Sequence, residues 1–166
     1  RPTELYGVLR VESRVHRDAR GAFIEDGLDT TLFGRLAIAH NTVQHTLRGI
    51  HFRADRWTEA KFVTCSRGSV FDVVVDLRTG QPTFRRWWGT VLDCGVGLYL
   101  PRGLAHGYLT LEDQTDVVYV LDDARSPPDD SRRGLRWDDP TVGVEWPALP
   151  SVMSEADQRW PLLEHA

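Results

Sequence analysis

The sequence has little cysteine, no long apolar run and no excess of basic residues. Its only two cysteines are Cys65 and Cys94, each in or beside a segment that predicts a strand. We interpret both as small buried hydrophobic side chains rather than as a disulfide or a metal site. No apolar run is long enough to span a bilayer. Residues 1–10 lack the apolar core of a signal peptide, and we therefore expect a cytoplasmic protein.

Charge and length narrow the class of protein further. Lys and Arg number 20 against 24 Asp and Glu, which gives a formal net charge of -4. This balance gives no reason to expect nucleic acid or an anionic membrane as a partner. The 166 residues contain no repeat, low-complexity tract or linker, so we expect a single domain spanning residues 1–166.

Short strand-like segments dominate the sequence. Each is rich in Val, Phe, Tyr, Trp or Leu, and turn residues such as Arg67-Gly68 separate them. The predicted strands are residues 36–41, 61–66, 70–77, 87–92, 97–100, 107–111 and 115–121. Many short strands with little helix favour a sandwich or a closed barrel. Helix is expected only at residues 28–33 and 154–160, the second with Ser154 as its N-cap.

Alternation along the predicted strands collects polar side chains on one face. Asp72, Val74 and Asp76 share a face, and His51 and Arg53 alternate in the same manner upstream. Such a face is either a solvent-exposed strand surface or part of the polar lumen of a barrel pocket. The pattern alone leaves both interpretations open.

A turn followed by a histidine indicates which kind of barrel this is. Residues 101–107 read PRGLAHG, and a Pro-x-Gly-x-x-His turn recurs in cupin barrels, where the histidine faces the lumen. His106 is therefore either a lumen residue or a satisfied structural histidine. Metal-binding cupins pair this histidine with a His-x-His segment, but here that segment is His51-Phe52-Arg53. Because arginine cannot bind a cation, we predict no metal.

Several motifs occur together and in a fixed order. They are residues 18–25 (DARGAFIE), 47–52 (LRGIHF), Lys61, 68–78 (GSVFDVVVDLR), 82–84 (PTF), 100–108 (LPRGLAHGY) and 143–147 (GVEWP). In this arrangement the chain resembles the dTDP-4-dehydrorhamnose 3,5-epimerase family, the cupin-fold enzymes of deoxysugar biosynthesis. The resemblance covers nearly the whole chain. It implies an all-β fold, a cupin-type jelly-roll β-barrel with short flanking helices, and an epimerase that needs no cofactor.

The resemblance also implies catalytic roles for three residues. Epimerisation beside a C4 ketone needs a base, a group that stabilises the enolate, and an acid on the opposite face. His51 matches the base, and Asp157 matches the carboxylate that orients it and favours its cationic form. Lys61 matches the lysine near the C4 oxygen, where a cation favours the enolate.

Further positions match the family's substrate-binding residues. Two arginines, Arg20 and Arg48, correspond to those that grip the nucleotide diphosphate. An aromatic residue, Phe23, corresponds to one that contacts the nucleotide, and the remaining matches line or support the pocket: Asn41, Asp72, His106, Tyr119 and Arg125. Family members are dimers in which a strand of one subunit completes the other's pocket. The resemblance thus implies a homodimer with strand exchange and a nucleotide-sugar substrate.

The sequence departs from the family at the acid. The position of the family's catalytic tyrosine holds Ala124, and that of its aromatic neighbour holds Arg125. Residues 42–47 form a shorter connection than in the family, and Ala39 replaces a glutamine. Alanine cannot donate a proton, whereas the family's base is retained.

Three interpretations therefore stay open. The protein epimerises a dTDP-4-keto-6-deoxyhexose at C3, C5 or both, as in antibiotic deoxysugar pathways. Alternatively, it uses the same enolate chemistry for isomerisation, for elimination or on a different keto compound. As a third possibility, it binds a sugar nucleotide without catalysis.

Overall fold

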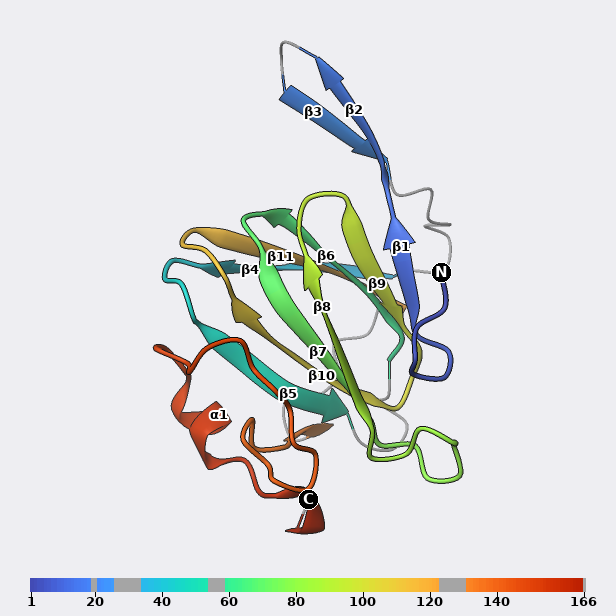
Figure 1. The fold of residues 1–166 in the computed structure, drawn as a ribbon, viewed down its shortest axis with the longest axis vertical. Helices are drawn as coiled ribbons and strands as arrows, with labels where there is room; N and C mark the ends of the chain where they lie inside the picture. Colours follow the sequence, from blue (N-terminus) through green and yellow to red (C-terminus); the bar gives the residue numbers. More distant parts are fainter. Residues whose placement is uncertain (19–20, 26–33, 54–58, 123–130, 166) are drawn as a thin grey trace.

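Two antiparallel sheets and a separate hairpin make up the architecture (Figure 1). The computed structural model describes residues 1–18, 21–25, 34–53, 59–122 and 131–165. The first sheet has the order β1 (Leu9–Glu12), β9 (Val96–Leu100), β6 (Lys61–Arg67), β11 (Thr115–Leu121) and β4 (Arg35–Asn41). The second has the order β12 (Arg132–Gly134), β5 (Leu47–Arg53), β10 (Leu104–Thr110), β7 (Val70–Asp76) and β8 (Trp87–Leu92). The expected all-β jelly-roll barrel with short flanking helices is confirmed.

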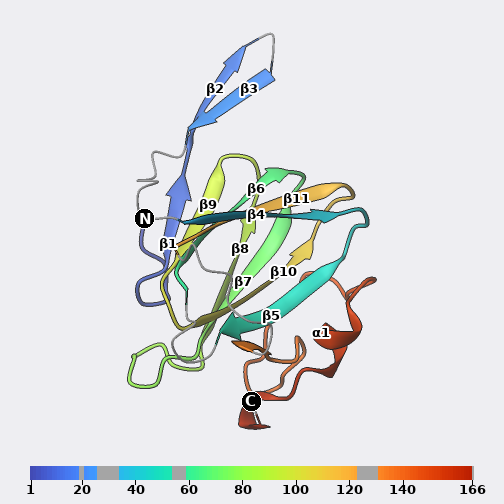
Figure 2. The ribbon, with the colours of Figure 1, turned by 180° about the vertical axis from the view of Figure 1, so that it is seen from behind.

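The hairpin formed by β2 (Arg14–Asp18) and β3 (Gly21–Glu25) projects away from the barrel. Figure 2 shows the same separation from behind, with the C-terminal segment at the far end of the molecule. Among the described strands, those of the hairpin pair only with each other.

The predicted strands agree with the structure except at their ends. The segments 87–92 and 115–121 match β8 and β11, whereas β10 begins three residues before the predicted 107. Strands β1, β2, β3, β5 and β12 were not among the predicted segments. The shortest, β12, consists of Arg132, Arg133 and Gly134, and such a sequence carries no apolar alternation.

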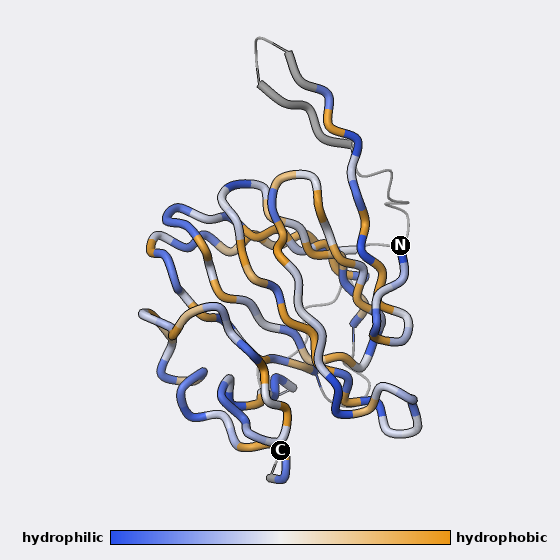
Figure 3. Tube along the Cα trace, in the orientation of Figure 1, coloured by the Kyte–Doolittle hydropathy of each residue, from blue (hydrophilic) through white to orange (hydrophobic). Residues whose placement is uncertain are grey.

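Apolar side chains pack on both faces of the second sheet. Val74 and Tyr108 belong to the cluster between the sheets, whereas Ile50, Val73 and Val75 pack on the outer face. Described C-terminal residues, including Leu135 and Leu163, cover that outer face. Each fully buried aliphatic side chain contributes roughly 1.5–3 kcal/mol. Figure 3 shows hydrophobic residues along the strands and hydrophilic ones in many of the loops.

The C-terminal segment contains the short helix α1 (Glu155–Arg159) and a 3-10 turn, η4 (Leu163–His165). Ser154 is the N-cap of α1, and its hydroxyl accepts a hydrogen bond from the backbone N–H of Asp157 at 3.1 Å. The helix predicted at residues 154–160 is thus confirmed. The one expected at residues 28–33 lies outside the described residues.

The two cysteines differ in their surroundings. Both are free thiols, and Cys65 is buried as expected, whereas Cys94 is exposed, so the expectation of burial is wrong for it. Cys94 follows the end of β8 in a turn, outside the alternation that places Cys65 inward. Among the described helices, none is long and apolar enough to cross a membrane.

Candidate active site

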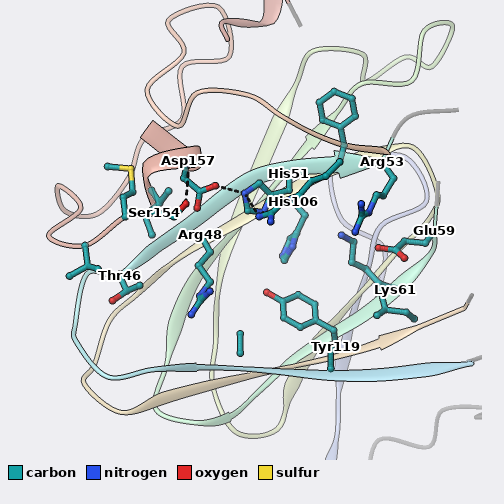
Figure 4. A pocket seen from close by; sticks show the side chains of 18 residues that line it. Thr46, Arg48, His51, Arg53, Glu59, Lys61, His106, Tyr119, Ser154 and Asp157 are labelled. Atoms are coloured by element: carbon teal, nitrogen blue, oxygen red, sulfur yellow. Dashed lines mark hydrogen bonds and ion pairs between the residues drawn. The ribbon is translucent and has the colours of Figure 1, made fainter. Parts of the chain in front are cut away.

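A cavity of about 680 Å³ lies between the two sheets (Figure 4). Its walls come from β4, β6 and β11 on one side and from β5, β10 and β12 on the other, and the segment that leads into α1 closes one end. Among its lining residues are six of the predicted catalytic and substrate-binding residues: Arg48, His51, Lys61, His106, Tyr119 and Asp157. Polar side chains of β5, β6, β10 and β11 therefore meet in one lumen.

A bulge in β5 brings Arg48 and His51 to the same wall. Arg48 is opposite Tyr108 and His51 is opposite His106, so the register shifts by one residue between them. Regular alternation would send these two β5 side chains to opposite faces. Gly49 sits in the bulge with φ +145°, and a Cβ added there would lie 2.6 Å from the Cα of Gly107. Only glycine fits this close approach of the two strands.

A histidine–carboxylate pair forms the centre of this wall. The Nε2 of His51 lies 2.5 Å from Oδ1 of Asp157, which is only 3% exposed. The indole N–H of Trp160 donates to the same oxygen at 3.1 Å. A carboxylate accepts, so Nε2 carries the proton and Nδ1 keeps the lone pair in the neutral ring. This contact joins the two residues that the family resemblance pairs as a His–Asp dyad.

The electrostatics of the dyad favour a neutral histidine beside a charged carboxylate. Burial lowers the pKa of His51, and the cations Arg132 and Lys61 act in the same direction, whereas Asp157 opposes them. Burial works to raise the pKa of Asp157, but hydrogen bonds from His51 and Trp160 hold it below its usual value. Asp157 thus favours the imidazolium as expected, yet burial outweighs it in the free protein.

The opposite wall carries a lysine and a tyrosine. Lys61 begins β6 and pairs with Leu121 of β11, two residues along that strand from Tyr119. Burial lowers the pKa of Lys61, and the nearby carboxylates Glu59 and Asp72 oppose that shift. In Figure 4 the side chains of Lys61 and Tyr119 point from this sheet toward the wall that bears His51.

His106 and Asp72 support the floor of the cavity. The Nε2 of His106 lies 3.0 and 2.8 Å from the two oxygens of Asp72, and both side chains are buried. The His106 ring also meets the Tyr119 ring edge to face, with centroids 6.0 Å apart. Asp76, on the same face of β7, instead accepts hydrogen bonds from Arg78 and Thr83 outside the cavity lining.

A series of hydrogen bonds anchors Arg48 at the cavity mouth. The Nε of Arg48 donates to Oδ1 of Asn41 at 2.8 Å, and the hydroxyl of Tyr108 donates to the same oxygen at 3.3 Å. The Asn41 amide in turn donates to the backbone oxygen of Thr115 at 3.0 Å. Arg48 is exposed, so its guanidinium is fixed at one end and accessible to an anion.

Some sequence-predicted positions are not placed in the cavity. Arg20, Arg125 and Ala124 lie outside the described residues, and for Phe23 only the backbone of β3 is described. Within the described ranges, no three His, Cys, Asp or Glu side chains are grouped as metal ligands.

Sequence patterns missed two residues that touch the dyad. Arg132 approaches the ring nitrogens of His51, with its Nη2 at 2.9 Å from Nε2 and 3.2 Å from Nδ1. Trp160 packs against Gly134, where an added Cβ would lie 2.5 Å from the indole. Neither stands in an apolar pattern that marks a site, because β12 is polar and Trp160 follows the end of α1.

Sequence and structure comparisons show which known proteins this chain is similar to. Residues 2–165 match the sequence model of the family described as dTDP-4-dehydrorhamnose 3,5-epimerase. An enzyme of that name from Sinorhizobium fredii is 41% identical over 121 residues, which are 71% of this chain and 61% of the relative. A dTDP-4-dehydrorhamnose 3-epimerase of Streptomyces niveus is 34% identical, and the match covers 100% of this chain and 84% of the relative. The solved RmlC epimerase of Mycobacterium tuberculosis has a TM-score of 0.90 at 34% identity, covering 99% of this chain and 88% of the other.

Proposed function

The chain belongs to the dTDP-4-dehydrorhamnose 3,5-epimerase family, and from that premise we propose that it epimerises a nucleotide-4-keto-6-deoxyhexose at C3, C5 or both. The nucleotide we propose is dTDP, which the names of the relatives contain. The observation that carries the proposal is the His51–Asp157 dyad, which lies in the cavity wall opposite Lys61.

Proton removal from the carbon beside a ketone suits this geometry. A neutral His51 has a lone pair on Nδ1 that can take the carbon-bound proton once a substrate replaces the Arg132 contact at that nitrogen, and the resulting imidazolium is stabilised by the adjacent carboxylate of Asp157. The electrons of the broken C–H bond move into an enolate, whose oxygen is negatively charged. Lys61 supplies the donor that such an oxygen needs on the other wall.

Arg48 suits the diphosphate. Its guanidinium is held by Asn41 and lines the cavity, and planar donors match phosphate oxygens.

We also propose a homodimer in which the projecting β2–β3 hairpin reaches the partner's cavity with Phe23 and Arg20. Support comes from the position of the hairpin, which stands clear of its own barrel. Light scattering on the purified chain measures the mass of the assembly, and a monomer would contradict this part of the proposal.

The enzymatic proposal is tested by hydrogen exchange. The protein is incubated in D₂O with a dTDP-4-keto-6-deoxyhexose, and the C3 and C5 protons are followed by NMR. Exchange with inversion supports epimerisation. Exchange with retention favours an enolising enzyme with another outcome, the alternative suggested by Ala124. Binding without exchange at either carbon would leave only a sugar-nucleotide binder.

His51→Asn is the decisive variant, and the chain provides a matched control. His40 makes a similar contact, with its Nδ1 2.5 Å from Oδ1 of Asp116, but its side chain is half-exposed and outside the cavity lining. Loss of the base should slow exchange by about 10²- to 10⁴-fold in His51→Asn. His40→Asn should exchange at the rate of the unaltered protein. Equal rates in both variants would show that His51 is not the base.

A further inference from the structure

An indole ring touches both members of the dyad from outside the cavity lining. His51 and Asp157 line the cavity, whereas Trp160 does not. The ring of Trp160 meets that of His51 edge to face, with centroids 6.1 Å apart, and its N–H donates to Oδ1 of Asp157 at 3.1 Å. Trp160 therefore contacts the base and its carboxylate at a place where a substrate in the cavity would not touch it.

The local sequence directs the indole to this place. Trp160 follows the last residue of α1 and comes three residues after Asp157, a spacing that puts both on one side of a helical turn. Pro161 comes next, and a residue before proline favours an extended backbone, as Trp160 has with φ −57° and ψ 144°. The chain leaves the helix there, and the backbone N–H of Arg136 donates to the oxygen of Pro161 at 3.0 Å, which ties the segment to the residues after β12.

The neighbouring strand leaves the space that the indole fills. Gly134 of β12 is paired with His51 of β5, so it is the cross-strand neighbour of the base. A Cβ added to Gly134 would lie 2.5 Å from Cδ2 and Cε2 of Trp160, whereas carbon atoms in contact are about 3.5–4.0 Å apart. Gly134 is not among the glycines with positive φ, so space and not backbone conformation requires a glycine here.

We propose that Trp160 controls the dyad through Asp157: its N–H shares the negative charge of the carboxylate, so that His51 stays neutral and can remove a proton. The inference rests on the proposed function, because it assigns a part in the same proton removal. Trp160 is a positioning residue in this scheme, since it contacts Asp157 and His51 and no reacting atom.

One carboxylate oxygen accepts from both rings. Oδ1 of Asp157 lies 2.5 Å from Nε2 of His51 and 3.1 Å from the indole nitrogen of Trp160. The indole nitrogen is a donor only, so the positive end of its N–H bond faces this oxygen. A second donor stabilises the carboxylate and weakens the attraction of the same oxygen for an imidazolium. Burial works to raise the pKa of Asp157, and the hydrogen bond from Trp160 is among those that lower it, after that from His51.

The charge of His51 depends on how strongly this oxygen attracts it. Burial lowers the pKa of His51, and Asp157 opposes burial. Trp160 carries no charge and acts by limiting what Asp157 offsets. Because the variants below leave every other charge in place, a change in the pKa of His51 reports on the indole. The other titratable or charged side chains that line the same cavity include Arg48 of β5, Lys61 of β6, His106 of β10, Tyr119 of β11 and Arg132 of β12.

Trp160→Phe removes the N–H and keeps an aromatic ring between Gly134 and His51. Without the second donor, Asp157 attracts the imidazolium more strongly, so the pKa of His51 should rise. On the rising limb of its pH profile, kcat/KM should then fall by about 2- to 10-fold, the contribution of one hydrogen bond, while the plateau at higher pH is retained. Loss of the carboxylate itself would move the limb in the opposite direction.

Gly134→Ala reaches the same hydrogen bond by another route. Its methyl group pushes the indole away from Asp157, so the rising limb should move in the same direction as in Trp160→Phe. Trp146→Phe is the matched control, because the indole N–H of Trp146 donates to the backbone oxygen of Trp137 at 2.9 Å and its ring packs on the outer face of the second sheet. That variant also loses an indole N–H but should leave the limb in place.

An NMR titration of the Cε1 proton of His51 measures its pKa without any substrate, and His51→Asn identifies the signal. A pKa that rises in Trp160→Phe and not in Trp146→Phe supports the inference. An unchanged pKa would overturn it, because the indole would then only pack. A lower pKa would also overturn it, because the carboxylate would have moved away from His51. Absence of C–H exchange in the unaltered protein would refute the proposed function, while the titration still decides whether Trp160 acts on the dyad.

Discussion

Asp157→Asn tests how much the buried carboxylate contributes to catalysis. The substitution keeps the size of the side chain and an oxygen that can accept from His51 or Trp160, but it removes the negative charge. The neutral histidine of the free protein tolerates this change. The imidazolium that forms during proton removal does not, because it loses its counter-charge inside the cavity wall.

The size of the effect follows from burial. The Asp157 side chain is 4% exposed and that of His51 is 23% exposed, so solvent screens the pair only weakly. An uncompensated charge in such a place costs about 3–5 kcal/mol. At about 1.36 kcal/mol for each factor of ten, kcat/KM should fall by roughly 10²- to 10⁴-fold.

The pH dependence of kcat/KM tests the dyad independently, through the direction in which the pKa of His51 shifts. Activity requires neutral His51, so kcat/KM rises with pH through the pKa of His51 and then levels off. That pKa is already lowered, chiefly by burial, and Asp157 alone opposes the lowering. Removing the carboxylate should lower it further. The rising limb of Asp157→Asn should therefore lie at lower pH than that of the unaltered protein, although its plateau is lower.

The assay is deuterium exchange and product formation between pH 4.5 and 8, with Asp116→Asn as the matched control. Asp116 contacts His40 in the more exposed histidine–carboxylate pair. Its substitution should leave both the plateau and the rising limb of kcat/KM unchanged. A limb that moves to higher pH in Asp157→Asn, or a plateau reduced by less than about tenfold, would refute the dyad argument. So would an equal loss in Asp116→Asn.

Three other changes probe the wall around the dyad and the barrel beyond it. Arg132→Gln removes a cation that lowers the pKa of His51, so the rising limb of kcat/KM should move to higher pH; a shift to lower pH would contradict this. Gly49→Ala forces a Cβ to 2.6 Å from the Cα of Gly107, which should lower the free energy of unfolding by about 1–3 kcal/mol and reduce turnover, as thermal melts and the exchange assay would show. Asp76→Ala removes a fully buried carboxylate that pairs with the largely buried Arg78, and it should lower the thermal midpoint by roughly 6–20 °C, from about 3–5 kcal/mol. Because the pKa of Asp76 is lowered in the folded protein, its stabilisation exists above its unfolded pKa, and the difference between variant and original should shrink as the pH falls.

Local signals in the sequence determined much of the scaffold. Alternating apolar residues placed β6, β7, β8, β9, β10, β11 and β4, and Ser154 marked the start of α1. Alternation also put Asp72 and Asp76 on one face of β7, but it left open whether that face was solvent-exposed or inward; the structure decides this, with Asp72 beside the buried His106. The strands and the start of the helix depend on neighbours in the chain, so residue types and spacing are enough to predict them. The chemical roles of His51 and Lys61 came from the resemblance to a family, which residue spacing alone does not supply.

What the tertiary structure alone decided is which faces meet. Strict alternation separates Arg48 from His51, and only the bulge at Gly49, closed against Gly107, turns both toward the cavity. The contact of Arg132 with His51 joins residues 81 positions apart, through a strand too short and too polar to leave a periodic signal. The facing position of Tyr119 likewise depends on the stacking of two sheets. Alternation defines the two faces of a strand, but packing of the whole chain determines which partner each face receives.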